Sequence, residues 1–319
     1  MKLAIKIDVD GLGPALSGAP RLADLLENQA AGASFLFSVG PDRSGTHIAH
    51  LLQRGLIGRA WRTRRIRRYS VNAALFGTLL PAPNLAEQSA EVMRAVRDRG
   101  FETGVRAFDH VHWRYTMTRQ KPEWIAQQIN LARQRYTDVL GEPPTLHGAP
   151  GWQFNRNACR LTQRFDFAYG SDTRGTHPFI PVFDAEVISC PQLPTTLPTL
   201  DELVAKEAMS GDAAVARLLE LTEELPHWGH VYSANAAFEG FKLLPQFEQL
   251  LRGWRRQGYE LMSLRDYLHA FQDREMPYHE VLAEAVPGRP GTVATQGKEF
   301  LGPSEDLTQL NDDHSGDSE

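Results

Sequence analysis

The chain has 319 residues, of which 42% are hydrophobic, and its 39 acidic residues outnumber its 34 lysines and arginines. No uncharged apolar run approaches the roughly 20 residues that span a bilayer, so a soluble or peripheral protein is expected. The chain enters a strand at Lys2 without a charged and apolar leader, which favours a cytoplasmic protein. Cys159 and Cys190 lack the paired spacing of a thiolate zinc site or a disulfide framework.

Short apolar segments of strand type alternate with longer segments of helical periodicity. One helix is expected to begin at Pro122, which suits a first turn, and its apolar residues recur at helical intervals as far as Tyr136. Such alternation predicts a parallel sheet or a single α/β barrel. Strands are expected near residues 2–9, 33–39, 101–107, 144–148, 167–170, 186–191, 229–234 and 259–262.

Two carboxylates stand at the end of the first expected strand. Because side chains alternate along a strand, Asp8 and Asp10 share a face and lie within reach of one ion or one substrate. In α/β barrels the chemistry gathers where strands end, and more polar residues are expected there. These are His110, His147, Asp172 and Asn235.

A basic insertion follows the second expected strand, at about residues 54–80. Between Arg54 and Arg68 it interleaves arginines with Trp61 and Ile66, and Tyr69 follows. Such a segment in a net acidic protein favours contact with an anionic membrane surface, where each cation is worth roughly 1 kcal/mol. A solvated helix face is the alternative. Phosphate backbones also attract arginine stripes, but no nucleic-acid-binding motif accompanies this one, so nucleic acid is not expected.

The end of the chain differs in composition from the rest. Residues 1–275 are predicted to form the barrel with its basic insertion, and residues 276–296 an extension packed on it. From Gly297 to Glu319 acidic, polar and small residues dominate, which predicts a disordered acidic tail.

A set of short motifs occurs in order along nearly the whole chain. They are Ile7–Asp10, Phe37–Asp42, Ala107–His110, Ala149–Trp152, Ser171–Gly175, Leu193–Glu202 and Phe238–Gly240. Together they resemble the NodB-type polysaccharide deacetylase family and, within it, the ArnD branch that deformylates undecaprenyl-phosphate-linked 4-formamido-arabinose. The resemblance implies a single distorted (β/α)₇ barrel, and a hydrolase of carbohydrate amides that binds a divalent metal of the zinc type.

The resemblance also implies roles for individual residues. Asp8 matches the catalytic base, Asp10 the metal-binding carboxylate and His110 the second histidine of a His-x-x-x-His metal pair. Two family residues are replaced. Arg106 stands where the first histidine of the pair is expected, and a guanidinium has no lone pair for a metal. Asn235 stands where the late general acid is expected, and an amide does not exchange protons near neutral pH.

These replacements leave two interpretations of the site. In one, a divalent metal is still bound by Asp10 and His110, with His147 as a possible substitute ligand and His112 and His177 as further candidates. In the other, the Arg106 guanidinium spans Asp8 and Asp10 as an internal cation, and the site needs no metal.

Two functions follow. The first is an amide hydrolase that acts on a polyprenyl-phosphate-linked amino sugar as a peripheral protein on the inner face of the bacterial inner membrane. The second is a catalytically inactive relative that binds the sugar-phosphate lipid or regulates a true deformylase. The expected substrate-binding residues in either case are Arg174, Asn235, Trp152 and Asp172.

Overall fold

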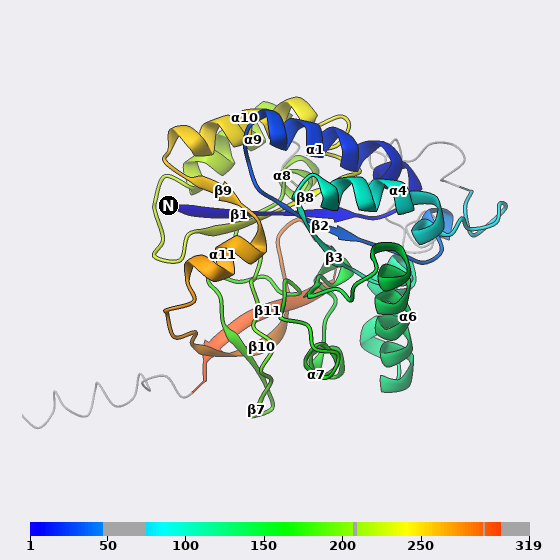
Figure 1. The fold of residues 1–319 in the computed structure, drawn as a ribbon. Coiled ribbons are helices and arrows are strands. Elements are labelled where there is room, and N and C mark those ends of the chain that lie inside the picture. The colour runs from blue at the N-terminus through cyan, green and yellow to red at the C-terminus, as the bar shows by residue number, and fades with distance from the viewer. Residues whose placement is uncertain (47–74, 207–208, 290, 301–319) are drawn as a thin grey trace, which may run out of the picture.

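A single parallel sheet forms the centre of the molecule (Figure 1). The structure, a computed structural model, describes residues 1–46, 75–206, 209–289 and 291–300. The sheet has the strand order β5-β4-β3-β2-β1-β8, and β9 also pairs with β1. Its strands are β1 (Lys2–Val9), β2 (Ser34–Phe37), β3 (Glu102–Val105), β4 (Leu146–His147), β5 (Tyr169–Gly170), β8 (His230–Asn235) and β9 (Glu260–Met262).

The sheet curls into the predicted distorted barrel, and an irregular segment closes it. Between β5 and β8, Leu193 N donates to Gly170 O at 2.8 Å and Thr196 N donates to Val231 O at 3.0 Å. This segment bridges the gap that a further regular strand would fill. The predicted α/β barrel class is therefore confirmed, with strands at the expected places.

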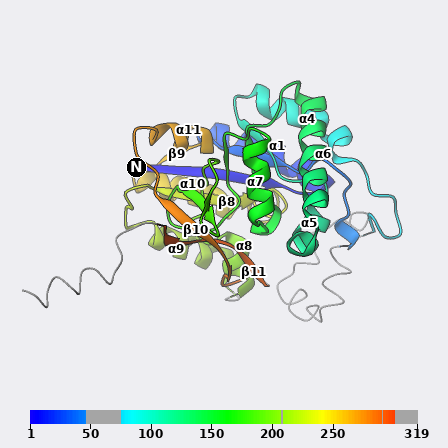
Figure 2. The same cartoon turned by 90° about the horizontal axis from the view of Figure 1, so that it is seen from below.

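Helices cover the outer face of the barrel (Figures 1 and 2). The expected helix at Pro122 is present as α6, with Pro122 in its first turn, and it ends at Gly141 in the left-handed conformation. The helices are α1 (Ala19–Asn28), α4 (Leu85–Asp98), α5 (His110–Thr116), α6 (Pro122–Leu140), α7 (Arg156–Arg164), α8 (Leu200–Lys206), α9 (Gly211–Leu221), α10 (Leu244–Arg256) and α11 (Leu264–Ala270), with short turns η1 (Pro14–Gly18), η3 (Met117–Arg119) and η4 (Pro150–Trp152).

The alternation of β1 determines what the barrel contains. Ile5 and Ile7 point outward into the main core between sheet and helices. Ala4 points inward and packs with residues of β2, β4 and α11 in a second apolar cluster. Lys6 and Asp8 are on the same face as Ala4, so a lysine and a carboxylate lie inside the barrel above that cluster.

A second, four-stranded sheet joins the end of the chain to the barrel. Its order is β11-β10-β6-β7, formed by β6 (Ile180–Phe183), β7 (Glu186–Val187), β10 (Tyr278–Ala285) and β11 (Thr292–Glu299). The strand expected near 186–191 is the short β7. β11 runs to Glu299, three residues past the predicted start of the tail, and residues 301–319 lie outside the described residues. Figure 2 shows the β10–β11 hairpin reaching the neighbourhood of α8.

The predicted basic insertion falls almost wholly on residues 47–74, which also lie outside the described residues. None of the helices in the described part of the chain is long and apolar enough to cross a membrane.

Candidate functional site

Arg106 lies between the two acids at the end of β1. Its Nη1 forms an ion pair with Asp8 Oδ1, and its Nε donates to Asp10 Oδ1 at 3.0 Å. Arg106 follows β3, and its backbone N–H bonds to Phe37 O, which holds the side chain beside the end of β1. The guanidinium is 2% exposed. We call Asp8, Asp10 and Arg106 the Arg106 cluster.

The charges of this cluster stabilise each other. Burial opposes ionisation of Asp10, but Arg106, His110 and the Ser38 hydroxyl outweigh it and lower the pKa of Asp10 to about 2. Ser38 Oγ donates to Asp10 Oδ1 at 2.6 Å. Burial also disfavours the Arg106 cation, yet Asp10 and Asp8 raise its pKa above the usual arginine value. Both aspartates are therefore compensated by a cation supplied by the chain itself.

The residues of the Arg106 cluster do not fit a divalent metal. Arg106 has no lone pair to donate, and its charge would repel a cation placed between the two carboxylates. Among the described residues no group of three or more histidines, cysteines or acids is arranged to hold a metal ion. His110 is the one feature that points the other way, because its Nδ1 is buried without a hydrogen-bond partner in the described chain.

The histidines considered as substitute ligands are engaged elsewhere. His147 Nδ1 lies 2.7 Å from Asp172 Oδ1, and its ring packs on Trp113 and Phe167. His147 directly follows Leu146, which faces the barrel interior, so His147 points out of the barrel. The His112 ring packs on Trp124, and His177 Nε2 lies 3.1 Å from His279 Nε2.

Asn235 pairs with Asp8 across β1 and β8, so it lies at the same strand end. Its side-chain oxygen accepts a hydrogen bond from Ala237 N at 2.9 Å, which fixes the turn after β8. Ser233, two residues earlier on the same face, donates to Asp8 Oδ2 at 3.4 Å. Asn235 thus contributes a neutral amide to the lining of the pocket.

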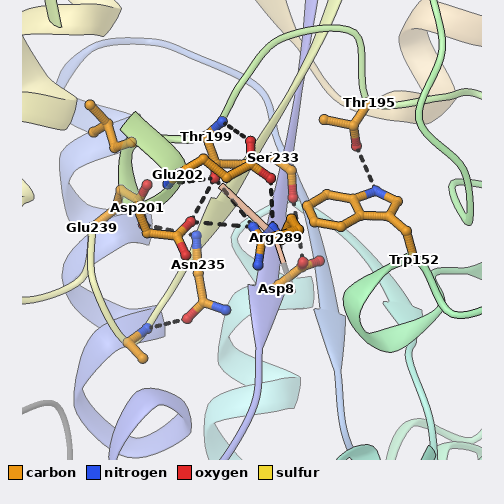
Figure 3. A network of polar contacts seen from close by, with 12 residues as sticks. Asp8, Trp152, Thr195, Thr199, Asp201, Glu202, Ser233, Asn235, Glu239 and Arg289 are labelled. Atoms are coloured by element: carbon orange, nitrogen blue, oxygen red, sulfur yellow. Dashed lines mark hydrogen bonds and ion pairs between the residues drawn. The ribbon is translucent and has the colours of Figure 1, made fainter. Parts of the chain in front are cut away.

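Arg174 pairs with Glu202 and not with its near neighbour Asp172. Its Nη1 donates to Glu202 Oε1 at 3.0 Å. Arg289 Nε donates to the same oxygen at 2.6 Å, and Figure 3 shows Arg289 beside Glu202. Arg289 lies in the turn between β10 and β11, so the second guanidinium that contacts Glu202 comes from this hairpin. We call Arg174, Glu202 and Arg289 the Glu202 cluster. The capping box of α8 fixes Glu202, whose Oε2 accepts from Thr199 N at 2.9 Å.

The ring of Trp152 contacts three cationic side chains. The Arg289 and Arg174 guanidiniums lie 4.6 and 4.8 Å from its ring centre, and Lys6 Nζ lies 5.4 Å away. The ring is 3% exposed, and its Nε1 donates to Thr195 Oγ1. Trp152 has φ of +54°, which is rare for a bulky residue and turns its side chain into the pocket. Trp152 therefore orders the cations and offers little free ring surface to a sugar.

Asp172 is a structural acid. It is fully buried, accepts from Ala149 N at 2.7 Å and from Gln192 Nε2 at 3.1 Å, and holds His147. These contacts tie β4, β5 and the closing segment together. The structure therefore brings Arg174, Trp152 and Asn235 to the pocket but places Asp172 in the packing behind it.

Lys6 and Glu239 are buried charges beside the site. Burial lowers the pKa of Lys6 to about 8, while Asp8 acts in the opposite direction, and Nζ donates to Ser171 O at 2.9 Å. Burial, assisted by Asp201, raises the pKa of Glu239 to about 8. The motifs did not indicate Lys6, although it shares the alternating face of Asp8. Glu239 belongs to the motif Phe238–Gly240, which suggested a pocket-wall or packing position.

A small, partly open pocket lies at the carboxyl ends of the strands, and its cavity volume of about 20 Å³ holds roughly one water molecule. It contains carboxylates, guanidiniums, an amide and hydroxyls, a set suited to the hydroxyl, amide and anionic groups of a modified sugar. Its lining residues are Asp8, Asp10, Arg106, Arg114, Gly151, Trp152, Thr199, Asp201, Ser233, Asn235 and Arg289.

Comparisons with known proteins agree with this geometry. Residues 64–170 match a family model described as polysaccharide deacetylase. The chain is 30% identical over 295 residues to the probable 4-deoxy-4-formamido-L-arabinose-phosphoundecaprenol deformylase ArnD of Shewanella sediminis, covering 92% of this chain and 94% of that protein. It is 28% identical over 285 residues to the protein of the same name from Wigglesworthia glossinidia brevipalpis, covering 88% and 97%.

The fold has a solved counterpart. The crystal structure of a putative polysaccharide deacetylase from Mycobacterium smegmatis superposes with a TM-score of 0.58 at 13% identity, covering 89% of this chain and 94% of that chain. At this identity the likeness concerns the fold alone. Taken with the relatives that match nearly its whole length, the chain belongs to the polysaccharide deacetylase family and is related within it to the ArnD deformylases.

Proposed function

We propose that this protein binds a polyprenyl-phosphate-linked amino sugar and does not hydrolyse its amide by a metal-dependent route. The observation that carries the proposal is the Arg106 guanidinium, which is buried in ion pairs with both Asp8 and Asp10. The choice of ligand is supported by the relatives, whose printed names describe deformylases of a 4-deoxy-4-formamido-arabinose-phosphoundecaprenol.

The expected size of the two missing rate contributions favours loss of hydrolysis over its partial retention. A positioned general acid typically contributes 10² to 10⁴-fold to a rate, and a Lewis-acid metal contributes several kcal/mol more. Asn235 supplies no proton at the place of the acid, and Arg106 takes the place of a metal ligand. With both contributions missing, the pocket keeps groups that hold a sugar but not those that cleave its amide.

Hydrolysis at a rebuilt site is the second candidate, and one observation favours it. His110 Nδ1 is buried without a partner in the described chain, and His110 contributes to lowering the pKa of Asp10, so the two side chains are neighbours. In this case Asp8 would be the base, and a divalent metal held by Asp10 and His110 would supply Lewis-acid chemistry.

The test restores the two missing family residues together. We would measure bound zinc by elemental mass spectrometry, and formate release from a short-chain prenyl-phosphate-linked 4-formamido-arabinose. The proposal expects binding without formate release or stoichiometric zinc in the wild type, and a gain of both in the Arg106→His, Asn235→His double variant. Asn235→His alone is the matched control, because it leaves Arg106 in place and should gain neither.

Formate release by the wild-type protein, with one equivalent of zinc that disappears in Asp10→Ala, would establish the second candidate instead. Failure of the wild type to bind the lipid-linked sugar would overturn the choice of ligand.

The proposed location is the inner face of the bacterial inner membrane, where the protein would be peripheral. The support is the composition of the segment Arg54–Arg68, which suits an anionic surface. Sedimentation with vesicles containing anionic lipid tests it. Binding should fall when the arginines of this segment are replaced by glutamine, or when the vesicles are neutral, and binding that ignores both changes would contradict the proposal.

A further inference from the structure

The charged residues that line the pocket balance one another in the described part of the chain. Asp8, Asp10 and Asp201 face Arg106, Arg114 and Arg289. Two of these guanidiniums are held in ion pairs with acids, Arg106 with Asp8 and Asp10 and Arg289 with Asp201 and Glu202. The cation that could meet an anionic group of a ligand is therefore Arg114.

Among the cations that line the pocket, Arg114 has no partner in the part of the chain that the structure describes. Arg106 pairs with Asp8 and Asp10, while Arg174 and Arg289 pair with Glu202. For Arg114, which lines the same pocket, the described residues provide neither an ion pair nor a hydrogen bond. Its charge acts on Asp10, whose pKa it helps to lower, but that carboxylate is already bound to Arg106 and Ser38.

Gly151 leaves the space in which the Arg114 side chain packs at the pocket. A Cβ built on Gly151 would lie 3.2 Å from Arg114 Nε and 3.3 Å from its Cγ, so the absence of a side chain there lets Arg114 pack against the turn. Gly151 has φ of +65° and directly precedes Trp152. Arg114 therefore packs against the same turn whose Trp152 ring contacts the Arg174 and Arg289 guanidiniums.

A second polar group without a partner lies on the same face of α5. His110 and Arg114 are four residues apart, so their side chains are neighbours on the helix. His110 is 8% exposed, and its Nδ1 has no hydrogen-bond partner in the described chain. Arg114 lines the pocket, and both residues act electrostatically on Asp10, whose pKa they help to lower. A buried polar atom without a partner is costly unless a ligand or water satisfies it.

We propose that His110 and Arg114 on α5 form a subsite for the phosphate group of the ligand. A guanidinium presents several donors in a plane and suits phosphate oxygens, and the imidazole adds one more donor. Arg106 favours this arrangement, because it offsets one of the two negative charges of Asp8 and Asp10 and so lessens their repulsion of the phosphate. The identification of the phosphate as part of a lipid-linked sugar rests on the proposed function.

The experiment compares ligands with and without phosphate. Isothermal titration calorimetry would measure binding of the short-chain prenyl-phosphate-linked 4-formamido-arabinose, and of the same sugar without its phosphate. Arg114→Ala should weaken binding of the phosphate-bearing ligand by about 10- to 100-fold, the usual worth of a hydrogen bond to a charged group, and leave binding of the phosphate-free sugar unchanged. His110→Gln should weaken the phosphate-bearing ligand by a smaller factor, and Arg114→Lys should keep part of the affinity.

The matched control is Arg119→Ala, which removes the same charge from an exposed position in the next turn, η3. It should bind both ligands like the wild type. Equal affinity of the Arg114→Ala variant and the wild type for the phosphate-bearing ligand would overturn the proposal.

A second probe separates this proposal from the proposed function. Binding of inorganic phosphate would be followed by broadening of its phosphorus NMR line in wild type, Arg114→Ala and Arg119→Ala. If the lipid-linked sugar does not bind but inorganic phosphate binds in an Arg114-dependent way, the phosphate subsite stands and the lipid-linked ligand is wrong. If neither probe binds to the wild type, the subsite itself is refuted.

Discussion

The Arg106 cluster and the Glu202 cluster are opposite arrangements of the same groups. In the first, one guanidinium is shared by two carboxylates; in the second, one carboxylate is shared by two guanidiniums. The first comes from the ends of β1 and β3, which flank β2 in the barrel, and the second from the loop after β5, from α8 and from the β10–β11 hairpin. Figure 3 shows Arg289 and Asp8 at the same pocket.

Each cluster depends on the residue that contacts both of the others, which is Arg106 in the first and Glu202 in the second. Arg106 and Glu202 are each 2% exposed, so water compensates neither. Removing a shared member leaves two buried like charges, which costs more than breaking an exposed pair. The two clusters differ in their response to removal of the shared residue. Without Arg106 the two carboxylates can take up protons, whereas without Glu202 the two guanidiniums cannot release theirs.

The largest effect is expected from Glu202→Gln. It leaves the buried Arg174 guanidinium without its ion-pair partner and leaves Arg289 only its 3.4 Å ion pair with Asp201, and glutamine still caps α8, so the loss is mainly electrostatic. We expect the free energy of unfolding to fall by about 3–5 kcal/mol in urea titrations. Glu220→Gln, which removes an exposed acid of an i,i+3 pair, should cost less than about 0.5 kcal/mol. Equal costs would mean that the Glu202 cluster is not held by charge.

Arg106→Met should destabilise less, by about 3 kcal/mol at pH 7. Asp10 in the wild type has a pKa of about 2, below its ordinary 3.8, so its stabilising contribution is complete above the ordinary value and is lost as the pH falls toward 2. Without Arg106 the carboxylates instead bind protons more readily in the folded state. The cost of the substitution should therefore shrink between pH 7 and pH 4.5.

The control for Arg106 is Arg99, which also joins two carboxylates, Asp24 and Glu27, but at the surface. Arg99→Met should cost less than about 1 kcal/mol and show little change over the same pH range. A cost for Arg106→Met that does not depend on pH would show that packing, and not charge, dominates at this position.

Protonation of Glu239 should make the stability of the folded protein depend on pH. Its folded pKa of about 8 lies above the ordinary 4.5, so between these values the folded state binds more protons than the unfolded state, and stability falls as the pH rises. The slope is at most about 1.4 kcal/mol per pH unit. Thermal unfolding should show a decline from pH 5 to pH 8 that Glu239→Gln removes and that the exposed Glu91→Gln leaves in place.

The smallest effect is expected from Ser38→Ala, which removes the 2.6 Å hydrogen bond to Asp10 but keeps Arg106. The loss should be about 1 kcal/mol, and the pKa of Asp10 should rise, which a carboxyl carbon NMR titration measures. An unchanged pKa would indicate that Arg106 alone sets the ionisation of Asp10.

Local periodicity predicted the parts of the fold and site that depend on a single strand. Alternation on β1 placed Asp8 and Asp10 on one face, and the ion pairs expected of Arg106 with both acids are present. The same rule, applied to β4, would have turned His147 outward, one residue after the inward Leu146. It would also have placed Lys6 inside the barrel.

The Glu202 cluster could not be predicted in this way. Glu202 and Arg289 meet only because β10 pairs with β6, at Tyr278 with Ile180, and β6 has only four residues while the eight residues of β10 are largely exposed. No periodic pattern links two segments so far apart in the chain. The hairpin was therefore predicted only as an extension, and Arg289 was not recognised as a pocket residue.

The β10–β11 hairpin makes the pocket dependent on the order in which the chain is synthesised. Asp8 and Asp10 leave the ribosome first, whereas Arg289 follows Glu202 by 87 residues. Until residue 289 is synthesised, Glu202 lacks one of its two guanidinium partners and the pocket lacks one of its lining residues. This pocket can therefore be complete only after nearly the whole described chain has been made.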